Sequence, residues 1–242
     1  MRRAEEVSHP HTLAYTICHA RGMMDIFRRR PEETPSYAGC VVSLCDEHGF
    51  PFWAAGGRIL NGWAATCRGE TELGIELLRG GLAAWRKTGA RLWLPILLAL
   101  EAEAHAKAGH SDTALQVIEE ALLISEDTGE RWAIAEVLRL KAGLLLATGR
   151  PTEEVEALLV NSLRIARHQQ ARSWELRTAC DLARLWQHQG REAEALQLVQ
   201  AIYDQFTEGF DIADLRDAKA LLAELEVSAA KSARRSGADA FH

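Results

Sequence analysis

Apolar residues recur along the chain with the spacing of an α-helix, in segments of about 18 residues. In residues 113–129 (TALQVIEEALLISEDTG) and residues 191–206 (REAEALQLVQAIYDQF) they fall mainly at steps of three and four. This spacing puts apolar side chains on one face of a helix and polar side chains on the other. The pattern therefore predicts a succession of amphipathic helices.

Glycines separate these segments at a regular interval. Six of them follow one another at steps of 20 residues, namely Gly49, Gly69, Gly89, Gly109, Gly129 and Gly149. Gly190 and Gly209 continue the series less regularly. A fixed period of this kind indicates an internal repeat. Because glycine adopts the left-handed conformation that ends many helices, we expect each of these glycines to terminate a helix.

Alternate segments differ, so the repeating unit is a pair of helices about 40 residues long. The first helix of each pair carries a small residue at a fixed place: Gly22, Gly62, Ala102, Ala142 and Ala183. The second helix carries small or apolar residues at i, i+4 and i+7, as in Gly74, Leu78 and Gly81. Small residues let two helices approach closely, and each pair can then bury its face only against its neighbours.

These patterns predict an all-α, right-handed solenoid of about five antiparallel helix pairs and a C-terminal capping helix. The predicted pairs span residues 9–49, 50–89, 90–129, 130–170 and 171–209, and the capping helix spans residues 211–227. Residues 228–242 lack a clear apolar face and are predicted to form a disordered tail. Residues 1–8 resemble the last turns of a helix whose partner is missing from the sequence.

The second-helix pattern resembles half of the tetratricopeptide signature. As in that family, the small residue of the first helix stands twelve positions earlier, for example Gly62 before Gly74 and Ala102 before Ala114. The period departs from the family's interval of about 34 residues, which implies longer helices here. The resemblance implies a helical repeat that binds other molecules.

Longer strings resemble a more specific group of proteins. Residues 49–64 (GFPFWAAGGRILNGWA) and 171–191 (ARSWELRTACDLARLWQHQGR) are similar to the C-terminal helical region of bacterial STAND-type signalling ATPases. In those proteins the repeats follow a class III adenylate cyclase or another output module and an NTPase. The likeness covers roughly residues 7–226, and neither catalytic part is present in this sequence. It therefore implies a sensing or binding region without the catalytic activities.

Composition and charge narrow the possible functions. Hydrophobic residues make up 48% of the chain, enough for a sizeable core. The net charge of −6, from 28 basic and 34 acidic residues, argues against nucleic-acid binding. No apolar run approaches the ~18 residues of a membrane span, and no secretory signal opens the chain. Five cysteines, an odd number, favour a reduced, cytoplasmic protein.

No catalytic or metal-binding motif stands out. The sequence has no Walker A loop, HExxH or CxxC motif. The best metal constellation lies in the first predicted pair and consists of Cys40, Cys45, His48, His9, His11 and His19. Structural zinc sites usually show two tight ligand pairs, so buried thiols and surface histidines are the favoured interpretation. We expect neither a metal nor a cofactor, and no enzymatic activity.

The tetratricopeptide register places several charged side chains and one tryptophan on the concave face of the solenoid. The candidate ligand-binding residues are Trp63, Glu103, Glu136, Arg139, Arg177 and Arg184. Guanidinium groups on successive pairs could bind carboxylates or phosphates. On this hypothesis Arg177 and Arg184 can be removed without loss of stability. The alternative for Glu136 and Arg139, three residues apart, is that they pair on the helix surface.

The predicted function is a non-catalytic protein-interaction or effector-sensing scaffold. It would bind a peptide, a protein or a small acidic ligand on the concave face. The alternative is self-association as a homodimer through the N-terminal repeat, where Leu13, Ile17 and Met24 are expected to expose apolar surface.

Overall fold

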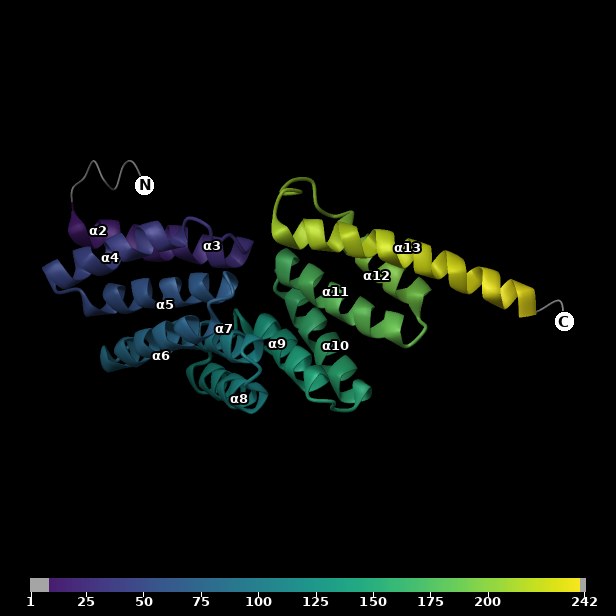
Figure 1. Cartoon of the computed structure of the whole chain (residues 1–242), viewed down its shortest axis with the longest axis horizontal. Coiled ribbons are helices and arrows are strands. Elements are labelled where there is room, and N and C mark those ends of the chain that lie inside the picture. Colours follow the sequence, from purple (N-terminus) through teal and green to yellow (C-terminus); the bar gives the residue numbers. More distant parts are fainter. Residues whose placement is uncertain (1–8, 240–242) are drawn as a thin grey trace. The chain divides into compact units, whose positions relative to one another are not determined.

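The computed structural model describes residues 9–239, with side chains as far as residue 230. Over the described range the chain is almost entirely helical and contains no β-strand. It divides into two compact units, and the boundary lies between Ala133 and Ile134. Figure 1 shows the helices of each unit as successive antiparallel neighbours.

In the first unit, each first helix packs against the second helix that follows it. The first helix of the N-terminal pair is one helical stretch with a π-helical middle, η1. The elements in chain order are α2 (Pro10–Tyr15), η1 (Thr16–Gly22), α3 (Met23–Arg28), α4 (Thr34–His48), α5 (Pro51–Cys67), α6 (Thr71–Lys87), α7 (Leu94–Lys107) and α8 (Ser111–Thr128).

The second unit continues the same arrangement with two more pairs and a long final helix. Its elements are α9 (Ile134–Ala147), α10 (Thr152–His168), α11 (Arg172–His188), α12 (Glu192–Tyr203) and α13 (Ala213–Asp239). Helix α13 packs against both α11 and α12, as a capping helix should. The predicted fold class, helix pairs followed by a capping helix, is confirmed.

The end of α13 differs from the prediction. The sequence places the end of the helix at residue 227 and a disordered tail over residues 228–242, but the helix continues to Asp239. The added stretch contains four Ala, two Arg and one Lys, which have high helix propensity even where no apolar face requires a helix. Residues 240–242 lie outside the described part of the chain.

Small residues bring the two helices of a pair into backbone contact. A Cβ atom added to Gly62 on α5 would lie 2.8 Å from the backbone nitrogen of Leu78 and 3.0 Å from the carbonyl oxygen of Gly74, both on α6. A Cβ atom on Gly81 would lie 3.0 Å from the backbone nitrogen of Ile59. The equivalent residues of the next pair, Ala102 and Ala114, are fully buried. The packing role predicted for these positions is confirmed.

Seven glycines of the series end helices as predicted, whereas Gly209 lies in the loop between Tyr203, where α12 ends, and Ala213, where α13 begins. The structure also extends the series. All eight glycines of the series have positive φ, between 69° and 86°. Two positions that continue the 20-residue interval hold other residues in the same conformation: Arg29, 20 residues before Gly49 (φ 56°), and Gln170, 20 residues before Gly190 (φ 55°). The repeat therefore imposes a left-handed residue even where the sequence lacks glycine.

The N-terminal pair exposes less apolar surface than expected. Met24 is 42% exposed, but Ile17 is buried and Leu13 is half-buried. Ile17 lies on η1, which packs against α4 and α5. Residues 1–8, the expected remnant of a missing helix, lie outside the described residues. Dimerisation through this pair stays a prediction.

Gln170→Gly should stabilise the protein. Side chains with a Cβ disfavour the left-handed conformation by roughly 1 kcal/mol, and the Gln170 side chain is exposed, so little packing is lost. Urea unfolding should show a gain of about 1 kcal/mol. Gln116→Gly, an exposed position inside α8, is the matched control and should cost about 1 kcal/mol. A loss of stability in Gln170→Gly would contradict the proposed role of this position.

Candidate functional site

The two predicted site residues of the first unit differ in accessibility. Trp63 is only 5% exposed, because nearly every residue of α5 from Trp53 to Thr66 is buried. The expectation that its indole faces an open groove is therefore wrong. Glu103, on α7, is partly exposed, and its carboxylate lies 3.0 Å from Nζ of Lys107, one turn later on the same helix.

The other four predicted residues lie in the second unit and belong to one network of ion pairs. Glu136 and Arg139 are one turn apart on α9. Arg139 donates to both carboxylate oxygens of Glu136, from Nε at 2.8 Å and from Nη2 at 2.9 Å. The two residues thus pair on one helix, as the alternative supposed, but Glu136 is buried and does not lie on the helix surface.

Two further contacts tie this pair to helix α11. Arg139 Nη1 donates to Asp181 at 2.6 Å, and Arg177 Nη1 donates to Glu136 at 3.1 Å. Arg177 Nε also donates to Asp214, in the first turn of α13, at 2.9 Å. The network thus joins α9, α11 and α13, and its members Glu136 and Asp214 are buried.

Burial and the two guanidinium groups act on Glu136 in opposite directions. Burial alone would raise the pKa of this carboxyl, because it disfavours the charged form. The charges and hydrogen bonds of Arg139 and Arg177 outweigh burial and lower the pKa to about 2. Glu136 is therefore ionised at neutral pH and neutralised by its partners. Both oxygens of this buried carboxylate already accept from guanidinium groups. Glu136 therefore stabilises one arrangement of the helices and is poorly placed to bind a ligand.

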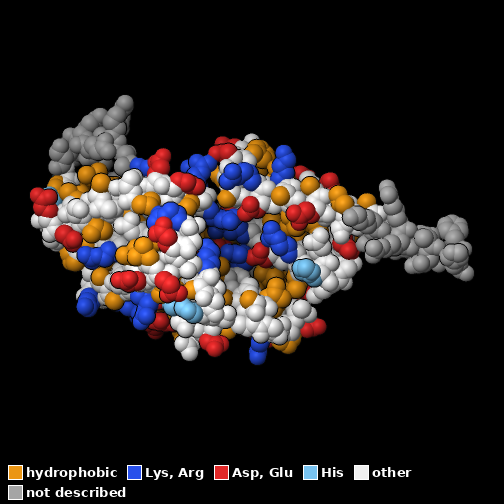
Figure 2. All heavy atoms as spheres, in the orientation of Figure 1, with side chains coloured by type: hydrophobic (Ala, Val, Ile, Leu, Met, Phe, Trp, Pro, Cys, Tyr) orange, Lys and Arg blue, Asp and Glu red, His pale blue; other side chains and the backbone are white. Residues whose placement is uncertain are grey.

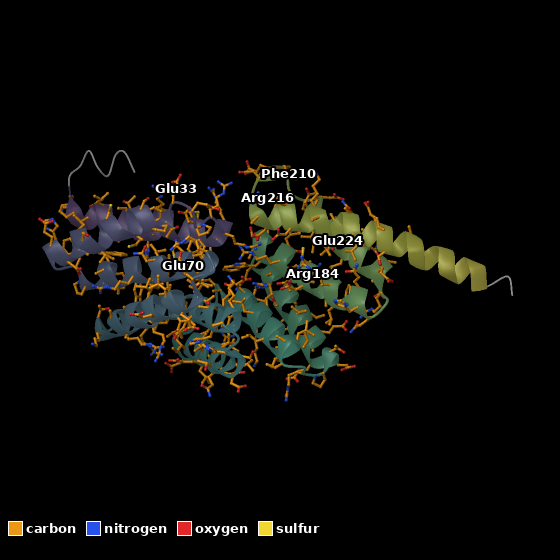
Figure 3. The ribbon with its side chains drawn as sticks, viewed as in Figure 1. Glu33, Glu70, Arg184, Phe210, Arg216 and Glu224 are labelled. Atoms are coloured by element: carbon orange, nitrogen blue, oxygen red, sulfur yellow. The ribbon has the colours of Figure 1, made fainter. Side chains whose placement is uncertain are left out.

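Arg184 stands at the outer end of the same network. It lies on α11 two turns beyond Arg177, and Figure 3 labels it. Its side chain is 49% exposed, against 18% for Arg139 and 12% for Arg177. Its contact with Asp181, at 3.4 Å between Nη1 and Oδ1, is long for a charge-assisted hydrogen bond. Of the three predicted arginines, Arg184 is the one most accessible to a partner.

Sequence reasoning did not assign the two aspartates that complete the network. Asp181 follows Arg177 by four residues and precedes Arg184 by three, so helical spacing alone could have paired it with either. Its link to Arg139 depends on how α9 and α11 pack, which the pattern of one helix does not reveal. The link from Asp214 to Arg177 likewise depends on how α11 and α13 pack.

A second buried carboxylate is held in the same way. Glu175, near the start of α11, is buried, and it accepts from Arg167 at 2.9 Å and from Arg172 at 3.1 Å. Both arginines are about half exposed. In the second unit, therefore, many of the arginines serve to neutralise carboxylates that packing has buried.

Within the described residues, no three His, Cys, Asp or Glu side chains are grouped so that they could hold a metal ion. Burial raises the pKa of the Cys18 and Cys180 thiols to about 12, the opposite of an activated nucleophile. None of the helices in the described range combines the length and the apolar character needed to cross a bilayer.

Comparisons with known proteins support the fold. No protein-family model matches the chain. BtubC (BKLC) from P. vanneervenii is similar in structure, with a TM-score of 0.63 and 16% identity over 88% of this chain and 93% of that one. Nearly identical tetratricopeptide-like repeats of a kinesin light chain-like protein from Podosopora anserina give a TM-score of 0.55, with 20% identity over 84% of this chain and 100% of that one. The chain therefore has a tetratricopeptide-like repeat fold.

One similar sequence belongs to a much longer protein. An uncharacterized protein of Rhizobium meliloti (strain 1021) is 26% identical over 167 residues. The match covers 69% of this chain but only 16% of the Rhizobium protein. The chain thus spans a small part of the length of this relative.

Replacement of Glu136 by Gln should destabilise the second unit in a pH-dependent way. At pH 7 the substitution removes the carboxylate that two mostly buried guanidinium groups share, although Arg139 keeps Asp181 and Arg177 keeps Asp214 as partners, at a cost of about 3 kcal/mol. The pKa of Glu136 is depressed in the folded protein. The ionised carboxylate therefore contributes its full stabilisation above its ordinary pKa of 4.5, and this stabilisation is lost as pH falls towards about 2. Urea unfolding should show the gap between Glu136→Gln and the unaltered protein narrowing over this range.

Glu103→Gln is the matched control, because its carboxylate pairs with a lysine at a partly exposed site. It should change the free energy of unfolding by less than about 1 kcal/mol at pH 7. A similarly small effect of Glu136→Gln at pH 7 would contradict a stabilising role for the network.

Proposed function

We propose that the chain is a non-catalytic, cytoplasmic scaffold that binds an acidic segment of a protein partner through the face of α11 that carries Arg184. The observation behind the proposal is the gradient of accessibility along the network. Arg139 and Arg177 are largely buried and neutralised, whereas Arg184 is half exposed and weakly held. A carboxylate from a partner can approach Arg184 without displacing a short ion pair.

The network also explains why Arg184 is well placed for binding. Its neighbour Asp181 is held at 2.6 Å by Arg139, so the carboxylate next to Arg184 already has a strong partner. The guanidinium of Arg184 therefore keeps donors for a second carboxylate, and its planar fork matches carboxylate geometry. The proposal narrows the six predicted residues to one direct contact, with Glu136, Arg139 and Arg177 fixing the helix that presents it.

The scaffold would serve as the sensing or docking part of a larger signalling assembly. The resemblance to the helical region of STAND-type ATPases supports this, and so does the similarity to a short part of the much longer Rhizobium protein. Homodimerisation through the N-terminal pair is the second candidate. Tyr15 and Met24, both more than 40% exposed, are the large apolar side chains that favour it.

Charge reversal at Arg184 should separate partner binding from folding. The unaltered chain and Arg184→Glu are immobilised, and proteins retained from a lysate of the source organism are identified. The affinity of each retained partner is then measured. Arg184→Glu should weaken binding by about 1 kcal/mol or more, a factor of roughly five to ten, and more strongly at low salt. The melting temperature should stay the same, because Arg184 is exposed.

Arg164→Glu, the same charge change at an exposed position on α10, is the matched control. It should retain the partner with unchanged affinity. Equal affinity of Arg184→Glu and the unaltered chain would refute the proposed contact, as would loss of binding in Arg164→Glu alone.

A further inference from the structure

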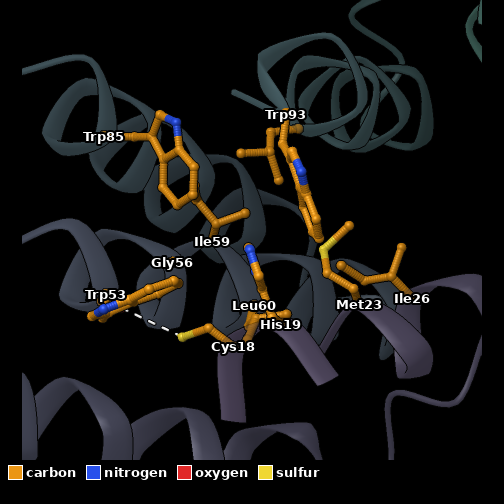
Figure 4. A pocket seen from close by; sticks show the side chains of 11 residues that line it. Cys18, His19, Met23, Ile26, Trp53, Gly56, Ile59, Leu60, Trp85 and Trp93 are labelled. Carbon is orange, nitrogen blue, oxygen red and sulfur yellow. Dashed lines mark hydrogen bonds between the residues drawn. The ribbon is translucent and has the colours of Figure 1, made fainter. Parts of the chain in front are cut away.

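The first unit contains an apolar pocket bounded by aromatic rings. Figure 4 shows Trp53 and Trp85 on one side of it and Trp93 on the other, with Ile59 between them. The lining side chains come from η1, α3, α5, α6 and the start of α7. The cavity measures about 20 Å³, room for about one water molecule, and with the open space at its mouth the unfilled volume is about 330 Å³. The space is therefore mostly a narrow slot.

Two rings close the mouth of this slot. His19 and Trp93 are partly exposed, whereas the other nine lining residues are buried. The imidazole of His19 stacks on the indole of Trp93, with ring centroids 4.3 Å apart and an angle of 7° between the planes. Burial lowers the pKa of His19, so the ring is neutral at physiological pH. A flat, uncharged ring thus already occupies the face of Trp93.

Both closing residues lie on irregular backbone. His19 belongs to η1, and π-helical turns within α-helices are rare and often occur at functional sites. Trp93 has a φ of 66°, which is disfavoured for a bulky residue. Unlike Arg29 and Gln170, it precedes a helix instead of ending one. The carboxylate of Glu130 holds this conformation, because both its oxygens accept from the backbone N–H of Trp93, at 2.9 and 3.0 Å.

Gly56 keeps the floor of the slot open, although no close backbone contact requires a glycine there. An added Cβ atom would lie 3.4 Å from Sγ of Cys18 and 3.6 Å from Cζ3 of Trp85, which are ordinary contact distances. At the neighbouring Gly57, by contrast, it would lie 2.5 Å from Cγ1 of Val41. Packing of α4 against α5 therefore explains Gly57, whereas Gly56 has no such close contact and lines the slot.

The geometry points to a binding site for a small, planar, uncharged aromatic molecule, which takes the place of the His19 ring against Trp93. The partly exposed imidazole swings out, and the ligand enters the slot between Trp93 and the wall formed by Trp53 and Trp85. This site lies wholly within the first unit. It is independent of the partner proposed for Arg184 and goes beyond that function.

The lining decides the chemical class of the ligand. It contains no Asp, Glu, Lys or Arg, so a charged ligand would lose its hydration without gaining an ionic partner. The indole N–H groups of Trp53 and Trp85 already donate, to His11 Nε2 at 3.0 Å and to the carbonyl oxygen of Leu92 at 3.2 Å. Stacking and apolar contact therefore dominate recognition, and these favour flat rings over globular molecules.

Calorimetric titration of the full chain with indole tests this proposal. The unaltered protein should bind indole saturably with one site per chain. Gly56→Ala places a methyl group in the slot and should weaken binding about tenfold or more. Gly80→Ala is the matched control, an exposed helical glycine of the same unit whose added Cβ meets no atom within 4 Å, and it should bind like the unaltered protein. Neither variant should melt earlier, because alanine favours helix over glycine.

Camphor, an apolar molecule of comparable size that is not planar, should not bind. Absence of saturable indole binding by the unaltered protein, up to the solubility limit of indole, would overturn the proposal without reference to any variant. Equal binding by Gly56→Ala would overturn it by placing indole elsewhere. Camphor binding as strong as that of indole would refute the planar aromatic class.

Discussion

The close approach of paired helices at small residues is the constraint on which the rest of the structure depends. Between α5 and α6 the backbones meet at Gly62, Gly74 and Gly81, where an added Cβ atom would come within about 3 Å of main-chain atoms. Such contact is possible only where side chains are absent, and it fixes the register of one helix against the next. Once the register is fixed, the residues that each first helix can present to solvent or to the next pair are also determined.

This constraint explains why the charged residues of the second unit behave so differently from one another. Packing buries Glu136 and Glu175 on their helices, and a buried carboxylate is tolerated only with cationic partners. Arg139 and Arg177 meet that requirement for Glu136, and Arg167 and Arg172 meet it for Glu175. Arg184, further along α11, is half exposed and makes a longer contact with Asp181. It is therefore the better candidate for binding a partner.

The sequence predicted the fold well because helix ends and tight crossings leave local traces. Glycines that end helices and small residues at fixed offsets can be recognised in the sequence. Arg29 and Gln170 adopt the same conformation as the glycines of the series, so their positions could not be recognised in this way. Prediction of the site was weaker. The tetratricopeptide register placed Trp63 at an accessible position, but its side chain is buried. Arg139 and Asp181 are 42 positions apart in the sequence, so their link depends on how α9 packs against α11. The irregular backbone at η1 and Trp93 has no signature in the repeat pattern.

Urea unfolding of Gly62→Ala, compared with Gly80→Ala, tests the central claim most directly. Both changes add one methyl group to a helical glycine of the first unit, but only the Gly62 methyl meets backbone atoms of a facing helix. The account predicts that Gly62→Ala loses about 1–3 kcal/mol of stability, whereas Gly80→Ala gains about 0.5–1 kcal/mol. Equal stabilities of the two variants would contradict the claim that close helix approach determines this fold.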